Sequence, residues 1–140
     1  MSISETPFTS SGQVVVVPLG TTTTSAARSG QRHFTVDEYR RMGAAGVFAV
    51  DDRLELIEGI VYMMSPIGKA HFRAVTVLQK RLRGMLGQAH DLAVQQPLEL
   101  IDSEPVPDLM IVRGPVEQYD SIPTAADVRL LIEVADTTLQ

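Results

Sequence analysis

The sequence predicts an α+β domain in which a mixed central β-sheet is flanked by helices, and three observations indicate this fold class. A capped helix pattern precedes a hairpin pattern, a long helical period comes next, and several short apolar runs follow it. A chain of 140 residues is expected to form one domain. The absence of cysteine excludes disulfide scaffolds, thiolate metal sites and cysteine nucleophiles.

The first 32 residues are expected to form a flexible N-terminal segment, and the domain is expected to span residues 33–140. Residues 21–30 are small and polar and offer nothing to bury. Val14–Val17 has the character of an edge strand, but Pro18 and Gly20 would end it quickly. We therefore favour irregular chain over a strand in this segment.

A short helix and a hairpin are expected at the start of the domain. Thr35 and Glu38 form a capping box, in which each side chain accepts a hydrogen bond from the other residue's backbone N–H. The two strands of the hairpin are expected at residues 53–57 and 60–64, on either side of the turn Glu58-Gly59. A glycine-containing turn of two residues favours this arrangement.

The clearest helical period in the chain runs from Lys69 to Gly87. Its apolar positions recur at three- and four-residue steps and fall on one face: His71, Val75, Leu78, Leu82 and Met85 or Leu86. Its basic residues fall on another stripe: Lys69, Arg73, Lys80 and Arg83. Four apolar runs after Gly87 predict strands covered on both faces: 92–94, 98–101, 109–112 and 128–134.

Three acidic residues stand inside or beside apolar strands, where an unpaired carboxylate is costly to bury. They are Glu55, Asp108 and Glu133. Each could point to solvent from a half-exposed strand. If they converge instead, they would form a hard oxygen site suited to Mg²⁺ or Mn²⁺, the kind of site that supports phosphodiester hydrolysis. Spacing alone does not decide between these readings.

An ordered set of motifs in residues 33–140 resembles the Uma2 family of endonucleases, in the PD-(D/E)XK nuclease superfamily. The motifs are Phe34–Tyr39, Leu54–Val61, Met64–Gly68, His71, Pro107-Asp108 and Ile132–Asp136. The resemblance implies a restriction-endonuclease-like core, DNA as the partner, and hydrolysis of DNA phosphodiester bonds with a divalent metal ion.

The resemblance also implies roles for particular residues. Asp108 corresponds to the metal-binding aspartate of the "PD" motif, and Glu133 to the acid that is the second metal ligand. Glu55 corresponds to the upstream acid at the edge of the same site. His71 corresponds to a histidine that contacts a phosphate or another site group. Because His71 heads the apolar stripe of its helix, a core histidine with a satisfied hydrogen bond is the competing interpretation.

The lysine that follows the second acid in this superfamily has no counterpart in the expected place. The chain's two lysines are Lys69 and Lys80, both upstream of Glu133. The sequence therefore predicts a core that lacks its C-terminal elements, and two functions stay open. One is a metal-dependent endonuclease, in which Lys69 could replace the missing lysine. The other is a catalytically inactive nuclease-fold module that acts in binding or dimerisation.

Charge and hydropathy bear on the partners and the cellular location expected for the protein. The net charge of −5 combines a basic middle of the chain with an acidic end, so it does not exclude DNA. The basic stripe could follow a phosphate backbone or be an ordinary solvated helix face. Apolar runs are too short for a membrane span, and the N-terminus does not resemble a secretory signal. We expect a cytoplasmic protein, not bound to membranes and able to form a homodimer.

Overall fold

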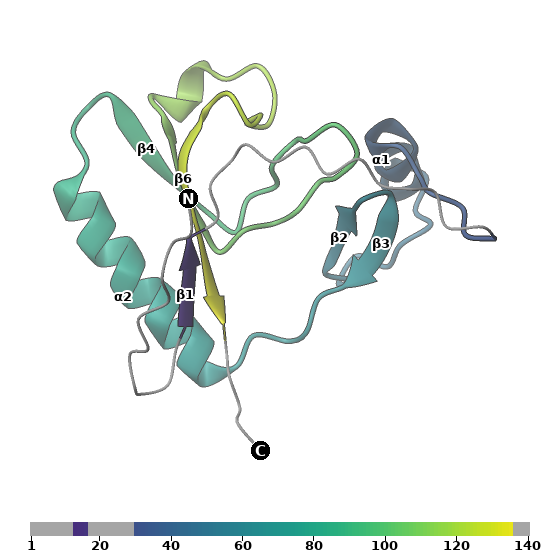
Figure 1. Cartoon of the computed structure of the whole chain (residues 1–140), viewed down its shortest axis with the longest axis horizontal. Helices are drawn as coiled ribbons and strands as arrows, with labels where there is room; N and C mark the ends of the chain where they lie inside the picture. The colour runs from purple at the N-terminus through teal and green to yellow at the C-terminus, as the bar shows by residue number, and fades with distance from the viewer. Residues whose placement is uncertain (1–12, 17–29, 136–140) are drawn as a thin grey trace, which may run out of the picture.

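The structure, a computed structural model, describes residues 13–16 and 30–135 and has the predicted α+β class (Figure 1). A four-stranded antiparallel sheet has the order β1-β6-β5-β4. Its strands are β1 (Gln13–Val16), β4 (His90–Val94), β5 (Leu109–Arg113) and β6 (Val128–Ala135). A separate antiparallel hairpin consists of β2 (Leu54–Ile57) and β3 (Ile60–Met63).

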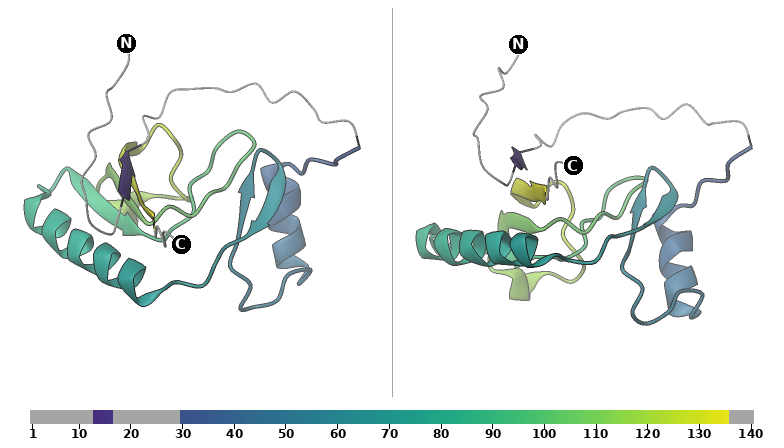
Figure 2. Two further views of the ribbon diagram at one scale, coloured as in Figure 1. Left: turned by 60° about the horizontal axis from the view of Figure 1, so that its bottom comes forward. Right: turned by 90° about the horizontal axis from the view of Figure 1, so that it is seen from below.

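In the described part of the chain, two α-helices accompany the two sheets. Helix α2 (Lys69–Met85) lies along one face of the four-stranded sheet, and α1 (Val36–Ala44) lies beside the hairpin, on the far side of the molecule (Figures 1 and 2). A single 3₁₀ turn, η1 (Val116–Gln118), follows β5. The predicted capping box of α1 is confirmed, because Thr35 and Glu38 each accept a hydrogen bond from the other's backbone N–H.

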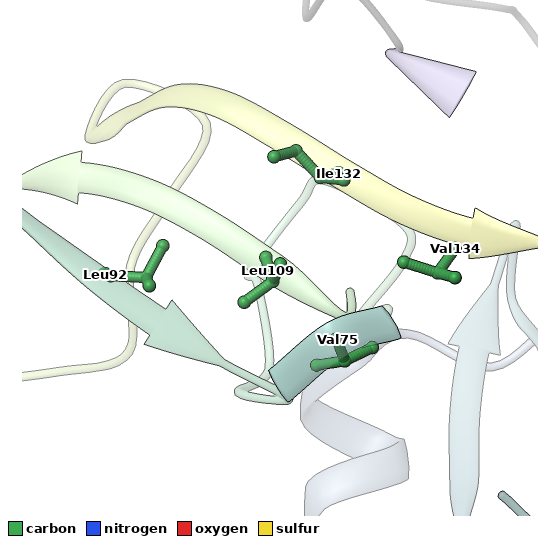
Figure 3. Packing of buried hydrophobic residues seen from close by; sticks show 5 residues of the cluster. All are labelled: Val75, Leu92, Leu109, Ile132 and Val134. Carbon is green, nitrogen blue, oxygen red and sulfur yellow. The ribbon is translucent and has the colours of Figure 1, made fainter. Parts of the chain in front are cut away.

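The core lies on both faces of the four-stranded sheet. On the face toward α2, Val75 packs with side chains from three strands (Figure 3): Leu92, Leu109, Ile132 and Val134. On the opposite face, the buried residues are Leu98, Met110, Val112 and Val128. Burial on both faces explains why these strands are continuous apolar runs, as the sequence analysis expected.

The structure differs from the sequence prediction in three details. The sheet ladders are antiparallel and not mixed, and the parallel pairing among the described residues is an isolated bridge between Glu99 and Thr124. The predicted strand at 98–101 is a tight reversal, in which the Leu100 N–H donates to the Ser103 carbonyl at 2.9 Å. An edge strand does form, as β1 at Gln13–Val16, which overlaps the apolar run Val14–Val17. The rest of the segment predicted to be flexible, up to residue 29, lies outside the described residues.

The β2–β3 hairpin is attached to the loop that leads into β5. Leu56 and Glu104 exchange backbone hydrogen bonds, with the Glu104 N–H 2.7 Å from the Leu56 carbonyl. The Arg40 side chain of α1 also anchors this loop, because it donates hydrogen bonds to the carboxylates of Glu104 at 2.6 Å and Glu99 at 2.7 Å. The hairpin and the start of β5 are therefore held side by side. No helix among the described residues has the length and apolar character needed to cross a membrane.

Candidate active site

A cavity of about 600 Å³ lies between the hairpin and the end of the four-stranded sheet where β6 finishes and β5 begins. Glu55, Asp108 and Glu133, the three acids singled out from the sequence, all line it, as does His71. Its other lining residues include Arg53, Ile57, Tyr62, the connection 63–68, Val106 and Val134. The structure thus brings together the four residues that the sequence analysis proposed for catalysis.

The register of β5 and β6 explains how Asp108 and Glu133 meet. Leu109 pairs with Ile132 in this antiparallel ladder, so extending the register by one residue places Asp108 opposite Glu133. Directly opposite side chains on one face of a sheet are close neighbours. The long sequence separation between the two acids is therefore bridged by strand pairing, a long-range feature that their spacing does not reveal.

Asp108 is nearly buried, with 7% of its surface exposed, and both of its carboxylate oxygens have a partner. Oδ2 accepts a hydrogen bond from the Val134 backbone N–H at 2.8 Å. Oδ1 lies 2.8 Å from Nε2 of His71. These contacts fix the carboxylate at the cavity and leave lone pairs on both oxygens for a further ligand.

His71 lies in the first turns of α2 and is mostly buried against Asp108. Its side chain is 16% exposed, and Nε2 is the atom that meets the aspartate. The satisfied hydrogen bond expected of a core histidine is therefore present, but its partner is a candidate site acid and the residue lines the cavity. The contact with Asp108 makes His71 a neighbour of the carboxylate cluster.

Glu133 is in an unfavourable place for a charge. Burial and, next, the nearby Asp108 carboxylate raise the pKa of Glu133 to about 7, from an ordinary value of 4.5, and Glu55 adds to the rise. Repulsion of this kind is typical of carboxylates that share a site. The cluster would accept a cation, because a positive ion removes the repulsion between the carboxylates.

The raised pKa predicts how stability depends on pH. The folded-state pKa exceeds the unfolded value, so the contribution of Glu133 to stability is fully present below about pH 4.5 and is lost as pH rises through about 7. In EDTA, Glu133→Gln is therefore expected to raise the free energy of unfolding at pH 8 by about 1–2 kcal/mol, after allowing for solvent screening. The gain should disappear near pH 4.5.

Urea unfolding at pH 4.5, 6 and 8 measures this effect. Glu117→Gln removes a carboxylate from the exposed turn η1 and serves as the control for a simple change of net charge. An equal gain in both variants at pH 8, or a loss of stability in Glu133→Gln, would contradict the prediction.

Glu55 approaches the cavity from the hairpin. Its Oε2 lies 3.5 Å from the Val106 backbone N–H, two residues before Asp108. Strand β2 alternates between its two faces, so that Leu56 is fully buried while Glu55 faces the cavity. The hairpin and the four-stranded sheet thus contribute carboxylates from opposite sides.

The donor set suits a hard divalent cation. Carboxylate oxygens are the ligands that Mg²⁺ and Mn²⁺ prefer, and burial together with the neighbouring Asp108 and Glu55 carboxylates raises the pKa of Glu133. Within residues 13–16 and 30–135, no three acidic or histidine side chains lie close enough together to hold a metal ion as they stand. The donor types of these residues suit a metal ion, and binding one would require the carboxylates to move closer together than they lie in this structure.

The basic residues proposed from the sequence do not line this cavity. Their side chains are exposed on α2: Lys69, Arg73, Lys80 and Arg83. Lys69 directly follows Gly68, which does line the cavity, and the helix carries the other three away from it. By helical periodicity the four share a stripe opposite the face that packs on the sheet.

Arg53 is a cavity residue that the sequence analysis missed. It stands one residue before β2 and lines the cavity together with Glu55. Strand alternation contains the relevant signal, because Arg53 and Glu55 are two positions apart and therefore share a face. That signal becomes informative only when the face of Glu55 is known to border the site.

Comparison with models of known protein families identifies the family of this chain. The Uma2 family model, described as "Putative restriction endonuclease", matches residues 36–140. Comparisons with curated proteins and with solved structures gave no significant match. The matched residues include the capped helix, the hairpin and all four candidate residues of the cavity. Since the family model covers most of the chain, the protein belongs to the Uma2 family.

Proposed function

We propose that this protein is a metal-dependent endonuclease that hydrolyses phosphodiester bonds in DNA. The observation that carries the proposal is the meeting of Asp108, Glu133 and Glu55 in one cavity, from two separate sheets. Carboxylates gathered from distant parts of a chain are costly without a counter-charge. A divalent cation would supply this counter-charge, and it would also attract a negatively charged phosphate.

Asp108, Glu133 and Glu55 would hold Mg²⁺ or Mn²⁺. When bound, such an ion polarises a phosphoryl oxygen and makes a bound water a better nucleophile. The residues of the chain supply the positioning. His71 and the Val134 N–H hold Asp108 in one orientation, and the attachment of the hairpin to the loop at Glu104 sets Glu55 on the opposite side.

In the proposed reaction a water oxygen bonds to phosphorus and one P–O ester bond breaks. One proton of the water leaves it during the attack, and the departing alkoxide takes up a proton to become a hydroxyl. The products are a phosphate monoester and an alcohol, so no oxidant or other co-substrate is needed. The cavity is open to solvent along the hairpin, where Tyr62 and Met63 are exposed, and this openness supports the proposal that cleavage occurs within a strand.

The function is tested by incubating the wild-type chain with supercoiled plasmid DNA in Mg²⁺, in Mn²⁺ and in EDTA. We expect nicked or linear product with either metal ion and none with EDTA. Calorimetric titration of the two ions into the chain gives an independent measure of metal binding. A chain that neither binds the ions nor cleaves DNA would refute the proposal.

A second candidate function is a nuclease-fold module that binds or dimerises without catalysis. It is favoured by the positions of Lys69 and Lys80, neither of which lines the cavity. Metal-independent DNA binding without cleavage would support this module over the enzyme. A homodimer and a cytoplasmic location also stay predictions, and sedimentation at several concentrations tests the first of them.

The exposed stripe on α2 is proposed as an additional, non-specific contact to the DNA backbone. Replacing Arg73 and Lys80 together by Glu should weaken DNA binding and flatten its dependence on salt, because each phosphate contact contributes about 0.9 to the logarithmic salt slope. Fluorescence anisotropy with duplex DNA at several salt concentrations measures this slope. Unchanged affinity would assign the stripe to an ordinary solvated helix face.

A further inference from the structure

The hairpin presents one of its faces to the cavity, and this face carries a positive charge beside the acid. Glu55 pairs with Tyr62 across the hairpin, and both line the cavity. Arg53 lies two positions before Glu55, and its carbonyl accepts a hydrogen bond from the Met64 N–H at 2.8 Å. Arg53, Glu55 and Tyr62 therefore stand on the same side of the hairpin.

The Arg53 side chain is anchored at the cavity and keeps most of its donors. One guanidinium nitrogen, Nη1, donates to the Ser65 carbonyl at 3.2 Å. Ser65 belongs to the connection between β3 and α2, which itself lines the cavity. A guanidinium has five N–H donors, so four remain. Among the ion pairs formed by the described residues, none involves Arg53.

A phosphodiester that enters this cavity meets three carboxylates of the same charge. It therefore needs cationic groups next to its own oxygens. A metal ion held by the acids is one such partner. Lys69 and Lys80 do not line the cavity, whereas Arg53 does and carries a permanent positive charge. Arginine also donates in a planar fork that matches two phosphate oxygens.

We propose that Arg53 binds the scissile phosphate of the DNA and stabilises the negative charge that develops on it during hydrolysis. This inference rests on the proposed nuclease function. The bond to Ser65 holds the guanidinium at the edge of the cavity before DNA arrives, which reduces the entropy lost on binding.

Two measurements on Arg53→Gln and Arg53→Lys test the proposal. In EDTA, where cleavage does not proceed, Arg53→Gln should lower the logarithmic salt slope of duplex binding by about 0.9, the value of one phosphate contact, and Arg53→Lys should keep it. In Mg²⁺, Arg53→Gln should reduce the cleavage rate by about a hundredfold, as expected for loss of one donor to the transition state. Arg53→Lys should fall between it and the wild type.

Arg81→Gln is the matched control, because Arg81 is exposed on α2 and does not line the cavity. It removes the same charge and should leave the cleavage rate unchanged, and thermal unfolding of all variants checks that they fold. If the wild type cleaves DNA while Arg53→Gln keeps the wild-type rate and salt slope, the role of Arg53 is refuted and the nuclease function stands. If the wild type neither binds nor cleaves DNA, the nuclease function itself fails.

Discussion

Asp108→Asn is expected to lower metal-dependent DNA cleavage by at least about a hundredfold, more than the loss of a supporting residue around a metal site usually costs. The substitution keeps the size of the side chain and an oxygen that can accept from the Val134 N–H. It removes the negative charge that would hold the cation. Because Asp108 is nearly buried at the centre of the carboxylate cluster, its charge is poorly screened by solvent.

Plasmid cleavage and calorimetric Mg²⁺ titration of the wild type, Asp108→Asn and Asp51→Asn measure this effect. Asp51 is exposed before β2, away from the cavity lining, so its variant controls for the loss of one aspartate charge. Circular dichroism establishes that the fold is retained. Cleavage by Asp108→Asn within a few-fold of the wild-type rate would exclude Asp108 as a metal ligand.

Gly59→Ala is expected to destabilise the protein by about 3 kcal/mol, through a left-handed backbone and a steric clash together. The turn residues Glu58 and Gly59 have φ values of 49° and 77°, as in the turns that suit hairpins. A Cβ on Gly59 would lie 2.7 Å from Cβ of His33 and 3.0 Å from the Phe34 carbonyl oxygen. The Gly59 carbonyl also accepts a hydrogen bond from the Phe34 N–H, and the Gly59 N–H donates one to the Asp102 carbonyl, both at 2.8 Å.

Gly84→Ala provides the opposite control. Gly84 lies inside α2, and a Cβ there would meet nothing within 4 Å. Alanine in a helix interior should stabilise by about 0.5–1 kcal/mol relative to glycine. Urea unfolding of both variants gives the two values, and equal effects of Gly59→Ala and Gly84→Ala would show that the turn is not under this constraint.

Local sequence signals predicted the elements that depend on neighbouring residues. The capping box at Thr35 marked the start of α1, the pair Glu58-Gly59 marked the hairpin turn, and the period after Lys69 marked α2. Each of these signals acts over a few residues and therefore can be read without the fold. Acids in apolar strands pointed to the residues of the cavity for a similar local reason, the cost of burying a charge.

Features that depend on contacts between distant parts of the chain could not be predicted from these local signals. The chain reversal at Leu98–Ser103 begins with residues as apolar as those of a strand. Its path is fixed by the backbone hydrogen bonds between Glu104, directly after it, and Leu56 of the hairpin. The meeting of Asp108 with Glu133 follows from strand register, and the hydrogen bond of His71 to Asp108 follows from where α2 crosses the sheet. Arg53 stayed unnoticed because an arginine before a strand carries no signal of its own.

The division of the carboxylates between two sheets has a consequence for the growing chain on the ribosome. Glu55 emerges early with the hairpin, Asp108 follows with β5, and Glu133 comes with β6, the last strand in the part of the chain that the structure describes. Domains acquire their non-local pairings only when the later partner has been synthesised. A nascent chain that ends before β6 thus has no assembled acidic cluster, and the proposed nuclease activity would require synthesis to have passed Glu133.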